Sequence, residues 1–272
     1  MSRYATDYTI DELMAVVISR NVKDGEKGLT GMATGGRTGV LAVGIPIVGM
    51  GLAQLTHAPN AVIMYGGYII NPKLEEITSL FETGHGTAYW QADAKIHTEH
   101  LFSIACNGEI DFGFSSGAQI DKFGNLNITS IGADYFHPKV RLVGNIFQTE
   151  HYTLHKREIQ VMDHERRSFV EKVDFITAPG YLDGVGAREK VGLKHGGPCM
   201  CVTNLAVLGY DEVTKRMKLQ SVHPGISIEK VKENTVFELI IPGEVPETEP
   251  PTVDEMQLIR CKIDPQCYLI PR

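Results

Sequence analysis

The groups best suited to chemistry in this sequence lie in residues 117–132, which read Gly-Ala-Gln-Ile-Asp-Lys-Phe-Gly-Asn-Leu-Asn-Ile-Thr-Ser-Ile-Gly. Gly117 and Ala118 follow an apolar run typical of a strand. Their backbone N–H groups could therefore lie at the carboxyl edge of a sheet, where open α/β sheets bind ligands, and stabilise a thioester oxyanion. Composition alone favours a structural hairpin instead, because Gly124 and Asn125 can adopt the positive φ of a tight turn. The residues by themselves leave both interpretations open.

Neither the paired cysteines nor the histidines in residues 85–100 have the spacing of a metal site. Cys199 and Cys201 are one residue apart, whereas structural zinc ligands are usually spaced by about two to four residues. His85, His97 and His100 have no carboxylate or further histidine at a ligand spacing. We expect the cysteines to be small core residues and the histidines to be solvated or to face a partner, with no metal bound.

The composition is ordinary for a folded protein, and its acidity argues against nucleic acid or membranes as partners. The chain has 272 residues, of which 43% are hydrophobic and 22% charged, and its formal net charge is -7. This length suits one large domain or two small ones, and the negative charge gives no broad attraction to anionic surfaces. The N-terminus lacks a signal-peptide pattern, and glycines with Pro46 interrupt the apolar residues 40–55. Five cysteines, an odd number, favour reduced thiols and a cytoplasmic location.

The elements that must position the loop follow a strand–helix–strand order. Residues 40–43 are predicted to form a buried strand, residues 47–55 a helix, and residues 61–65 a second strand that ends at Gly66 and Gly67. Such an order implies a parallel sheet that is covered by helices.

Further elements are predicted by capping signals and apolar runs. Thr9 with Glu12, and Thr252 with Glu255, form capping boxes that predict a helix near each end. Residues 23–39 hold six glycines, which is typical of loops or strand edges. The other predicted strands are 110–114, 140–143, 159–162, 173–176, 199–207, 217–222 and 237–241, and a short helix is predicted at 229–234.

The predicted organisation is one α/β domain over residues 1–241, followed by a linker and a tail. Four prolines among glutamates make residues 242–251 an extended acidic linker. Residues 252–272 then form a C-terminal helix and tail.

The motif in residues 117–132 resembles the signature loop of glutaconate CoA-transferase β subunits, which belong to the family I CoA-transferases. The resemblance runs from about Val40 to Pro265, and its matching segments are 44–59, 117–132, 137–141, 164–172 and 178–184. Residues 221–225 and 258–265 resemble β subunits of the CoA-transferase-fold hydrolases that open rings in bacterial steroid breakdown. The resemblance implies an α/β CoA-transferase (NagB/RpiA-like) fold, in which a mixed sheet carries helices on both faces. It also implies an α-type partner subunit, in an α2β2 heterotetramer.

The resemblance breaks at the nucleophile. The family's transferases attack the thioester with a glutamate, which in β subunits ends the strand after Ala-Pro; a carboxylate suits this role as nucleophile and as leaving group. Here Gly66 stands at that position, or Tyr65 with a shift of one residue, and neither can form an anhydride. Glu75 and Glu76 are the nearest carboxylates and are expected on a solvated helix face. In the ring-opening relatives the β chain also lacks this glutamate, and one of the α chain is thought to act.

The resemblance also implies roles for residues of this chain. Gly117 and Ala118 are expected to donate oxyanion N–H groups, while basic residues in 137–141 and 164–167 could meet the phosphates of coenzyme A or form solvated turns and intersubunit ion pairs. The residues expected to bind substrate or to shape its loop are Gly66, Gly67, Gln119, Asn125 and Asn127. Coenzyme A would arrive as part of the substrate, and no bound cofactor is expected.

The expected function is that of the β subunit of a heteromeric CoA-transferase-family enzyme that acts on an acyl-CoA thioester and lacks the usual glutamate. Two other chemistries remain open, namely a carbon–carbon bond hydrolase that opens a cyclic β-keto acyl-CoA and a decarboxylase of an unsaturated diacid-CoA. A non-catalytic scaffold subunit is an alternative of a different class.

Overall fold

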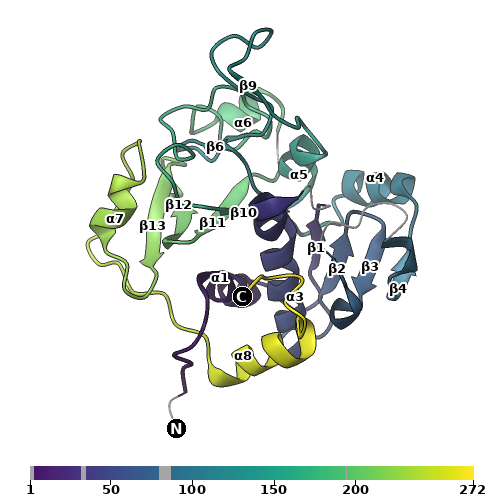
Figure 1. Cartoon of the computed structure of the whole chain (residues 1–272). Helices are drawn as coiled ribbons and strands as arrows, with labels where there is room; N and C mark the ends of the chain where they lie inside the picture. Colours follow the sequence, from purple (N-terminus) through teal and green to yellow (C-terminus); the bar gives the residue numbers. More distant parts are fainter. Residues whose placement is uncertain (1–2, 32–34, 80–86, 194) are drawn as a thin grey trace. The chain divides into compact units, whose positions relative to one another are not determined.

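The computed structural model describes residues 3–31, 35–79, 87–193 and 195–272 and divides the chain into two compact units (Figure 1). Residues 1–114 and 249–272 form one, the terminal unit, and residues 115–248 form the other, the central unit. The division expected from the sequence follows chain order, whereas the contacts group residues from both ends of the chain in the terminal unit.

The terminal unit is built on a mixed sheet with the strand order β5-β1-β2-β3-β4. Strand β1 (Lys27–Thr30) pairs in parallel with β2 (Val62–Tyr65) and with β5 (Phe112–Ser115). Strands β3 (Ile69–Pro72) and β4 (Ala92–Lys95) extend the sheet in antiparallel pairs. The expected α/β class with a mixed sheet is confirmed.

The first strand of the strand–helix–strand unit is not where the sequence analysis placed it. The prediction of a strand at 40–43 is wrong, because these residues belong to the π-helix η1 (Val40–Gly44), between α2 (Gly36–Gly39) and α3 (Ile45–Leu55). The strand is β1, in the glycine-rich segment. A short apolar run does not distinguish a buried strand from a buried helix, and this helical run is buried on nearly every side.

Glycines in α3 permit close helix packing rather than breaking the helix. A Cβ on Gly49 would lie 2.7 Å from the carbonyl oxygen of Ala15 in α1 (Ile10–Ser19). Residues 36–55 are long and apolar enough to cross a membrane by length and composition, yet 78% of that window is buried within the protein. The run packs against α1, β1 and β2, as the core helix of a folded domain does.

Short helical elements connect the strands β3, β4 and β5 of the terminal unit. Residues 74–76 form a 3-10 turn, η2 (Leu74–Glu76), and η3 (Thr87–Tyr89) precedes β4. Helix α4 (Thr98–Cys106) leads into β5.

The central unit carries a second set of strands in the order β13-β12-β11-β10. Strand β10 (Arg157–Met162) is parallel to β11 (Pro198–Thr203), while β12 (Ala206–Tyr210) and β13 (Met217–Val222) are antiparallel neighbours. The single strand predicted at 199–207 is therefore wrong, because the chain reverses after Thr203. The predictions at 173–176 and 237–241 are also wrong, and only Ile240 makes an isolated bridge to β13.

The helices of the central unit are short, and two hairpins complete it. The helices are α5 (Gln148–Leu154), α6 (Ala187–Lys190) and α7 (Ile228–Glu233), and the hairpins are β6 (Gln119–Ile120) with β7 (Leu126–Asn127) and β8 (Ser130–Ile131) with β9 (Val140–Arg141). The apolar core lies between these elements and the strands and includes Tyr152, Phe169, Leu208 and Phe237. The predicted elements at 217–222 and 229–234 are confirmed as β13 and α7.

The acidic segment 242–251 is extended but fastened. The N–H of Val222 donates to Pro246, and the N–H of Thr248 donates back to Val222 at 2.7 Å. The buried hydroxyl of Thr248 also contacts Ser221 and His223. This segment therefore continues the edge of the sheet along β13.

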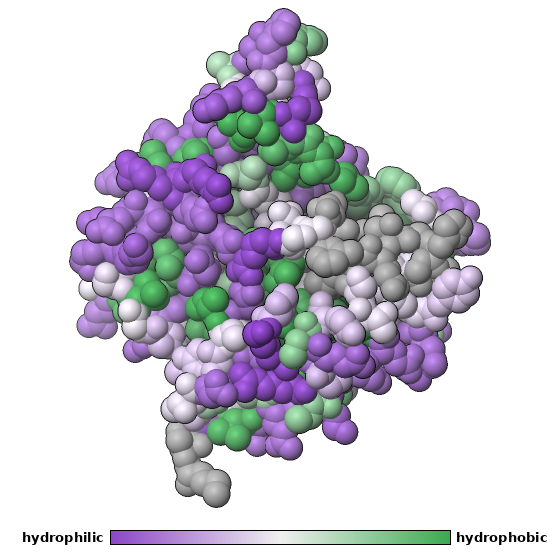
Figure 2. Space-filling view, viewed as in Figure 1, coloured by the Kyte–Doolittle hydropathy of each residue, from purple (hydrophilic) through white to green (hydrophobic). Residues whose placement is uncertain are grey.

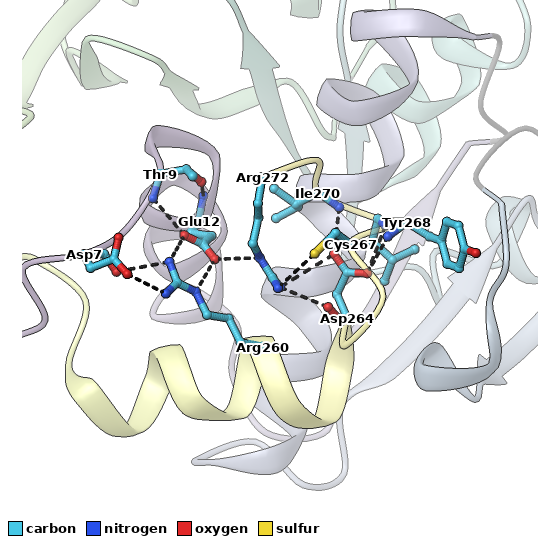
Figure 3. A network of polar contacts seen from close by, with 10 residues as sticks. Asp7, Thr9, Glu12, Arg260, Asp264, Cys267, Tyr268, Ile270 and Arg272 are labelled. Atoms are coloured by element: carbon cyan, nitrogen blue, oxygen red, sulfur yellow. Dashed lines mark hydrogen bonds and ion pairs between the residues drawn. The ribbon is translucent and has the colours of Figure 1, made fainter.

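A buried carboxylate fastens the last helix to the first (Figure 3). Helix α8 (Val253–Leu258) begins at the predicted capping box and continues into the π-helix η4 (Ile259–Ile263). Glu12 has a fully buried side chain, and its Oε1 lies 2.8 Å from Nε of Arg260 and 2.9 Å from Nε of Arg272. Burial by itself would raise the pKa of Glu12. Hydrogen bonds from Arg260 and the Thr9 N–H, with the charges of both arginines, hold that pKa below its ordinary value.

Replacing Glu12 by glutamine tests this clamp. The Glu12→Gln variant should lose about 2–3 kcal/mol of unfolding free energy at pH 7, because Arg260 and Arg272 lose their shared buried carboxylate and keep only Asp7 and Asp264 as acidic partners. The low folded pKa means that the advantage of glutamate is complete above its unfolded pKa, near 4.3, and disappears as the pH falls further. Urea unfolding at pH 7 and below pH 4 measures both effects. Glu109→Gln, which removes a half-exposed partner of Lys27, should change stability by less than about 1 kcal/mol; equal losses in the two variants would contradict the clamp.

Candidate functional site

The loop singled out in the sequence leaves β5 and enters the β6–β7 hairpin of the central unit. Gly117 is a crowded position, since a Cβ there would lie 2.7 Å from the Leu126 side chain and 3.2 Å from the Asn127 carbonyl oxygen, and Leu126 would have to shift. The N–H of Ala118 donates to that same carbonyl at 2.9 Å. Gly117 N–H has no hydrogen-bond partner in the described part of the chain. Of the two expected oxyanion donors, Gly117 is thus the one whose N–H is available in this conformation.

Gln119 and Asn127 hold the hairpin together through their amides. Nδ2 of Asn127 donates to Oε1 of Gln119 at 2.7 Å and to the Ser130 carbonyl at 2.8 Å. Oδ1 of Asn127 accepts from the N–H of Thr129 at 2.9 Å. Gln119 in turn donates to the Asp174 carboxylate and accepts from the Asp174 N–H. Both side chains are buried, so they shape the loop by fixing its backbone.

Asn125 joins the hairpin turn to a second segment, residues 178–184. Its Oδ1 accepts from the N–H groups of Gly180 and Leu182 at 3.0 and 3.1 Å. Its Nδ2 donates to the Leu182 carbonyl and to the carboxylate of Asp121, both at 2.9 Å. Leu182 has a φ of +54°, a conformation that disfavours L side chains by about 1–2 kcal/mol. Asn125 therefore binds both backbone groups of a strained residue.

The turn itself is tight and buried. Gly124 has a φ of +71°, as predicted, whereas Asn125 contributes its side chain rather than a positive φ. A Cβ on Gly180 would lie 2.3 Å from the Gly124 carbonyl carbon, so the two backbones are in direct contact. Gln160 of β10 donates to the Gly124 carbonyl at 2.9 Å. Burial raises the pKa of Asp121 and outweighs the hydrogen bonds that it accepts from Asn125 and Phe123.

Gly66 and Gly67 belong to the terminal unit, at the end of β2. Both have positive φ, +56° and +77°, and the N–H of Gly66 donates to Thr30 at the end of β1. A Cβ on Gly67 would lie 2.1 Å from the Leu101 side chain of α4. No carboxylate ends this strand, and Glu75 and Glu76 lie exposed on η2, as expected.

The basic segments near the loop differ in what they offer to a phosphate. His164 is buried and contacts Thr203 and Thr235, and burial lowers the pKa of its ring to about 3. It is neutral at physiological pH. Arg167 is exposed and pairs with Glu165, while His137 is exposed and pairs with Asp134 at 2.9 Å.

An open groove of ≈ 300 Å³ runs beside the turn. Its rim carries Lys122, which pairs with Glu171, and Lys172. Residues from both joined segments line it, including Asp121, Phe123 and Leu182.

A prominent apolar patch lies at the β8–β9 hairpin, in residues 135–146. Phe136 is 82% exposed and Val143 61% exposed, with Tyr135 and Ile146 about half exposed. Tyr135 is held in place, because its ring stacks on Phe175 and lies under the Arg141 guanidinium. Figure 2 shows hydrophobic surface at the base of this projecting loop. Exposed apolar patches of this kind mark protein–protein contacts.

One polar cluster was missed by the sequence analysis. His151 lies in helix α5 and His155 is the C-terminal cap of that helix. Both lie beside Glu158 of β10 in the interior of the central unit. The signal available in the sequence was the spacing His-x3-His-x2-Glu, which joins two histidines on one helical face to a carboxylate after a turn.

Comparisons with known proteins agree with the geometry. Residues 12–234 match the family described as Coenzyme A transferase. The chain is 35% identical over 266 residues to the β subunit of glutaconate CoA-transferase from Acidaminococcus fermentans, covering 96% of this chain and 94% of that protein. The crystal structure of that bacterium's glutaconate coenzyme A-transferase superposes with a TM-score of 0.84, at 33% identity and with 98% of each chain covered.

Two further relatives are named for CoA transfer and for ring-cleaving hydrolysis, respectively. The chain is 32% identical over 254 residues to the β subunit of 3-oxoadipate CoA-transferase from Pseudomonas knackmussii, covering 93% of this chain and 92% of the relative. It is 28% identical over 219 residues to the IpdB subunit of the cholesterol ring-cleaving hydrolase from Mycobacterium tuberculosis, covering 80% and 84%.

Proposed function

Because the chain belongs to the coenzyme A transferase family, as a β-type subunit, we propose that it forms an acyl-CoA enzyme with an α-type subunit and contributes the oxyanion loop but no nucleophile. Two features together carry this proposal: the loop at residues 117–127 is intact and rigid, and strand β2 ends in Gly66 and Gly67. Coenzyme A enters as part of the substrate, and no resident cofactor is proposed. The proposed location is the cytoplasm, with an α2β2 assembly.

The substrate class follows from the relatives. Glutaconate and 3-oxoadipate are both dicarboxylates, and this supports a dicarboxylic acyl-CoA as the substrate. Hydrolysis of a carbon–carbon bond in a cyclic β-keto acyl-CoA is the second candidate, and the similarity to a ring-cleaving hydrolase subunit together with the absent carboxylate favours it.

In the proposed reaction the N–H of Gly117 binds the oxygen that becomes negative when the thioester carbonyl is attacked. Such a donor accelerates the reaction because its position is already fixed and needs no rearrangement as charge develops. The amides of Gln119, Asn125 and Asn127 supply that fixation. Ala118 would act as a second donor only after releasing the Asn127 carbonyl.

Two substitutions of Gly117 separate the effect of losing its N–H donor from the effect of adding a side chain. Gly117→Pro removes the donor, whereas Gly117→Ala keeps it, and both add a Cβ beside Leu126. In the co-expressed heteromer, the proline variant should turn over acyl-CoA about a hundred- to thousandfold more slowly than the alanine variant. Circular dichroism must show both folded. Equal rates would remove Gly117 from the oxyanion site.

Assembly tests the proposed partner. Light scattering of the chain co-expressed with an α-type subunit should give one heteromeric species. Phe136→Asp should weaken the complex at least about tenfold, because a charge replaces an apolar contact in the patch at residues 135–146. Val213→Asp, at a position 77% exposed in the β12–β13 turn, is the matched control and should assemble normally. Two separate species, with full activity in this chain alone, would refute the heteromer.

The missing carboxylate makes a chemical prediction. When the heteromer is incubated with glutaconyl-CoA or 3-oxoadipyl-CoA and then reduced with borohydride, peptide mapping should find no reduced glutamate in this chain. Reduction at a glutamate of the α subunit, or label from heavy-oxygen water in the released carboxylate, is the expected result. Reduction at Glu75 or Glu76 would restore ordinary transfer through a glutamyl thioester in this chain.

A further inference from the structure

A group of three buried ligand-type side chains lies in the central unit, away from the loop hairpin. His151 is 3% exposed, and His155 and Glu158 are not exposed at all. The potential ligand atoms of the three residues all lie within 4.8 Å of one another. Nδ1 of His151 is 3.3 Å from Oε1 of Glu158, and Nδ1 of His155 is 3.6 Å from Oε2.

The cluster is not satisfied by its own contacts. Within the described residues, both ring nitrogens of His155 and Oε2 of Glu158 are buried without a hydrogen-bond partner. Buried polar groups are nearly always paired, and an unpaired one suggests an absent water or ion. Three unpaired atoms gathered on two neighbouring side chains therefore indicate a ligand that binds both of them.

The geometry points to a metal ion, and we propose that His151, His155 and Glu158 bind one zinc-type divalent cation. Zinc binds imidazole nitrogen and carboxylate oxygen at about 2.0–2.2 Å, so two ligands of a tetrahedral ion lie roughly 3.4 Å apart. The 3.3 Å from His151 Nδ1 to Glu158 Oε1 and the 3.6 Å from His155 Nδ1 to Glu158 Oε2 are close to this value, and a bound ion would replace the hydrogen bond between His151 and Glu158. Magnesium and calcium prefer oxygen ligands alone, whereas a set of two histidines and one carboxylate suits zinc.

The position of the ion suggests its role. It would join the C-terminal end of α5 to the start of strand β10, where the Glu158 N–H donates to the Gly197 carbonyl. Helix α5 also touches the segment just before the oxyanion loop, where Gln148 donates to the Ser116 carbonyl at 3.0 Å and the Tyr152 hydroxyl lies 3.0 Å from Ser115. A metal at this point would brace α5 and, through it, the start of the loop.

Metal binding to the full-length chain tests the proposal directly. After metal-free purification, the protein is titrated with Zn²⁺ and, separately, with Co²⁺, whose visible spectrum reports a tetrahedral site. We expect about one ion per chain with the tetrahedral Co²⁺ band, and a rise in the melting temperature on Zn²⁺ addition. Glu158→Gln should weaken binding by at least about ten- to a hundredfold.

A histidine variant outside the cluster serves as the control for metal binding. His100→Gln, outside the cluster and on an exposed helix end, should leave stoichiometry and affinity unchanged. A wild-type chain that binds no stoichiometric zinc, or shows no tetrahedral Co²⁺ band, overturns the proposal. Binding that survives in Glu158→Gln, or that His100→Gln removes, overturns it as well. If Glu158→Gln does not fold, the wild-type titration and melting shift decide alone.

Discussion

The side chain of Asn125 joins two segments of the central unit that are otherwise far apart in sequence. It accepts from Gly180 and Leu182, donates to Leu182 and Asp121, and is itself buried. Without it, the N–H groups of Gly180 and Leu182 and the carbonyl of Leu182 would lose this partner, and each unmet hydrogen bond of a buried group costs about 1–3 kcal/mol. The turn at Gly124, the left-handed Leu182 and the approach of the two backbones all depend on this one amide. The hydrogen bonds of Asn125 therefore fix the path of the chain that follows Gly117.

The features that could be predicted from the sequence are those whose determinants are local. Capping boxes at Thr9 and Thr252 depend on residues three apart, and each starts a helix in the structure. The loop at 117–132 was identified as a dense motif, and its glycine turn formed as expected. Other features depend on partners that spacing does not show. The Ala118 N–H is taken by a carbonyl nine residues later, and that pairing is set by the register of the hairpin.

The errors share a physical cause. Residues 40–43 are apolar and short, so they fit a strand or a buried helix, and packing against α1 decided for the helix. Residues 199–207 are mostly apolar, yet the hydroxyl of Thr203 accepts from the Leu205 and Ala206 N–H groups where the chain reverses. The histidine and glutamate cluster required a turn between α5 and β10 to bring its members together. Periodicity carries no information about such reversals.

The contact between Gly180 and Gly124 has a consequence for how this chain can change over generations. Two backbones touch there with no side chain between them, so neither segment has slack with which to absorb an inserted residue or a larger side chain in the other. The turn and the segment 178–184 are therefore expected to change together in evolution, because a change in one alone would disrupt the packing of both. Substitutions are more easily accommodated on the open rim of the groove, where side chains such as Lys122 and Lys172 can be exchanged without moving the backbone.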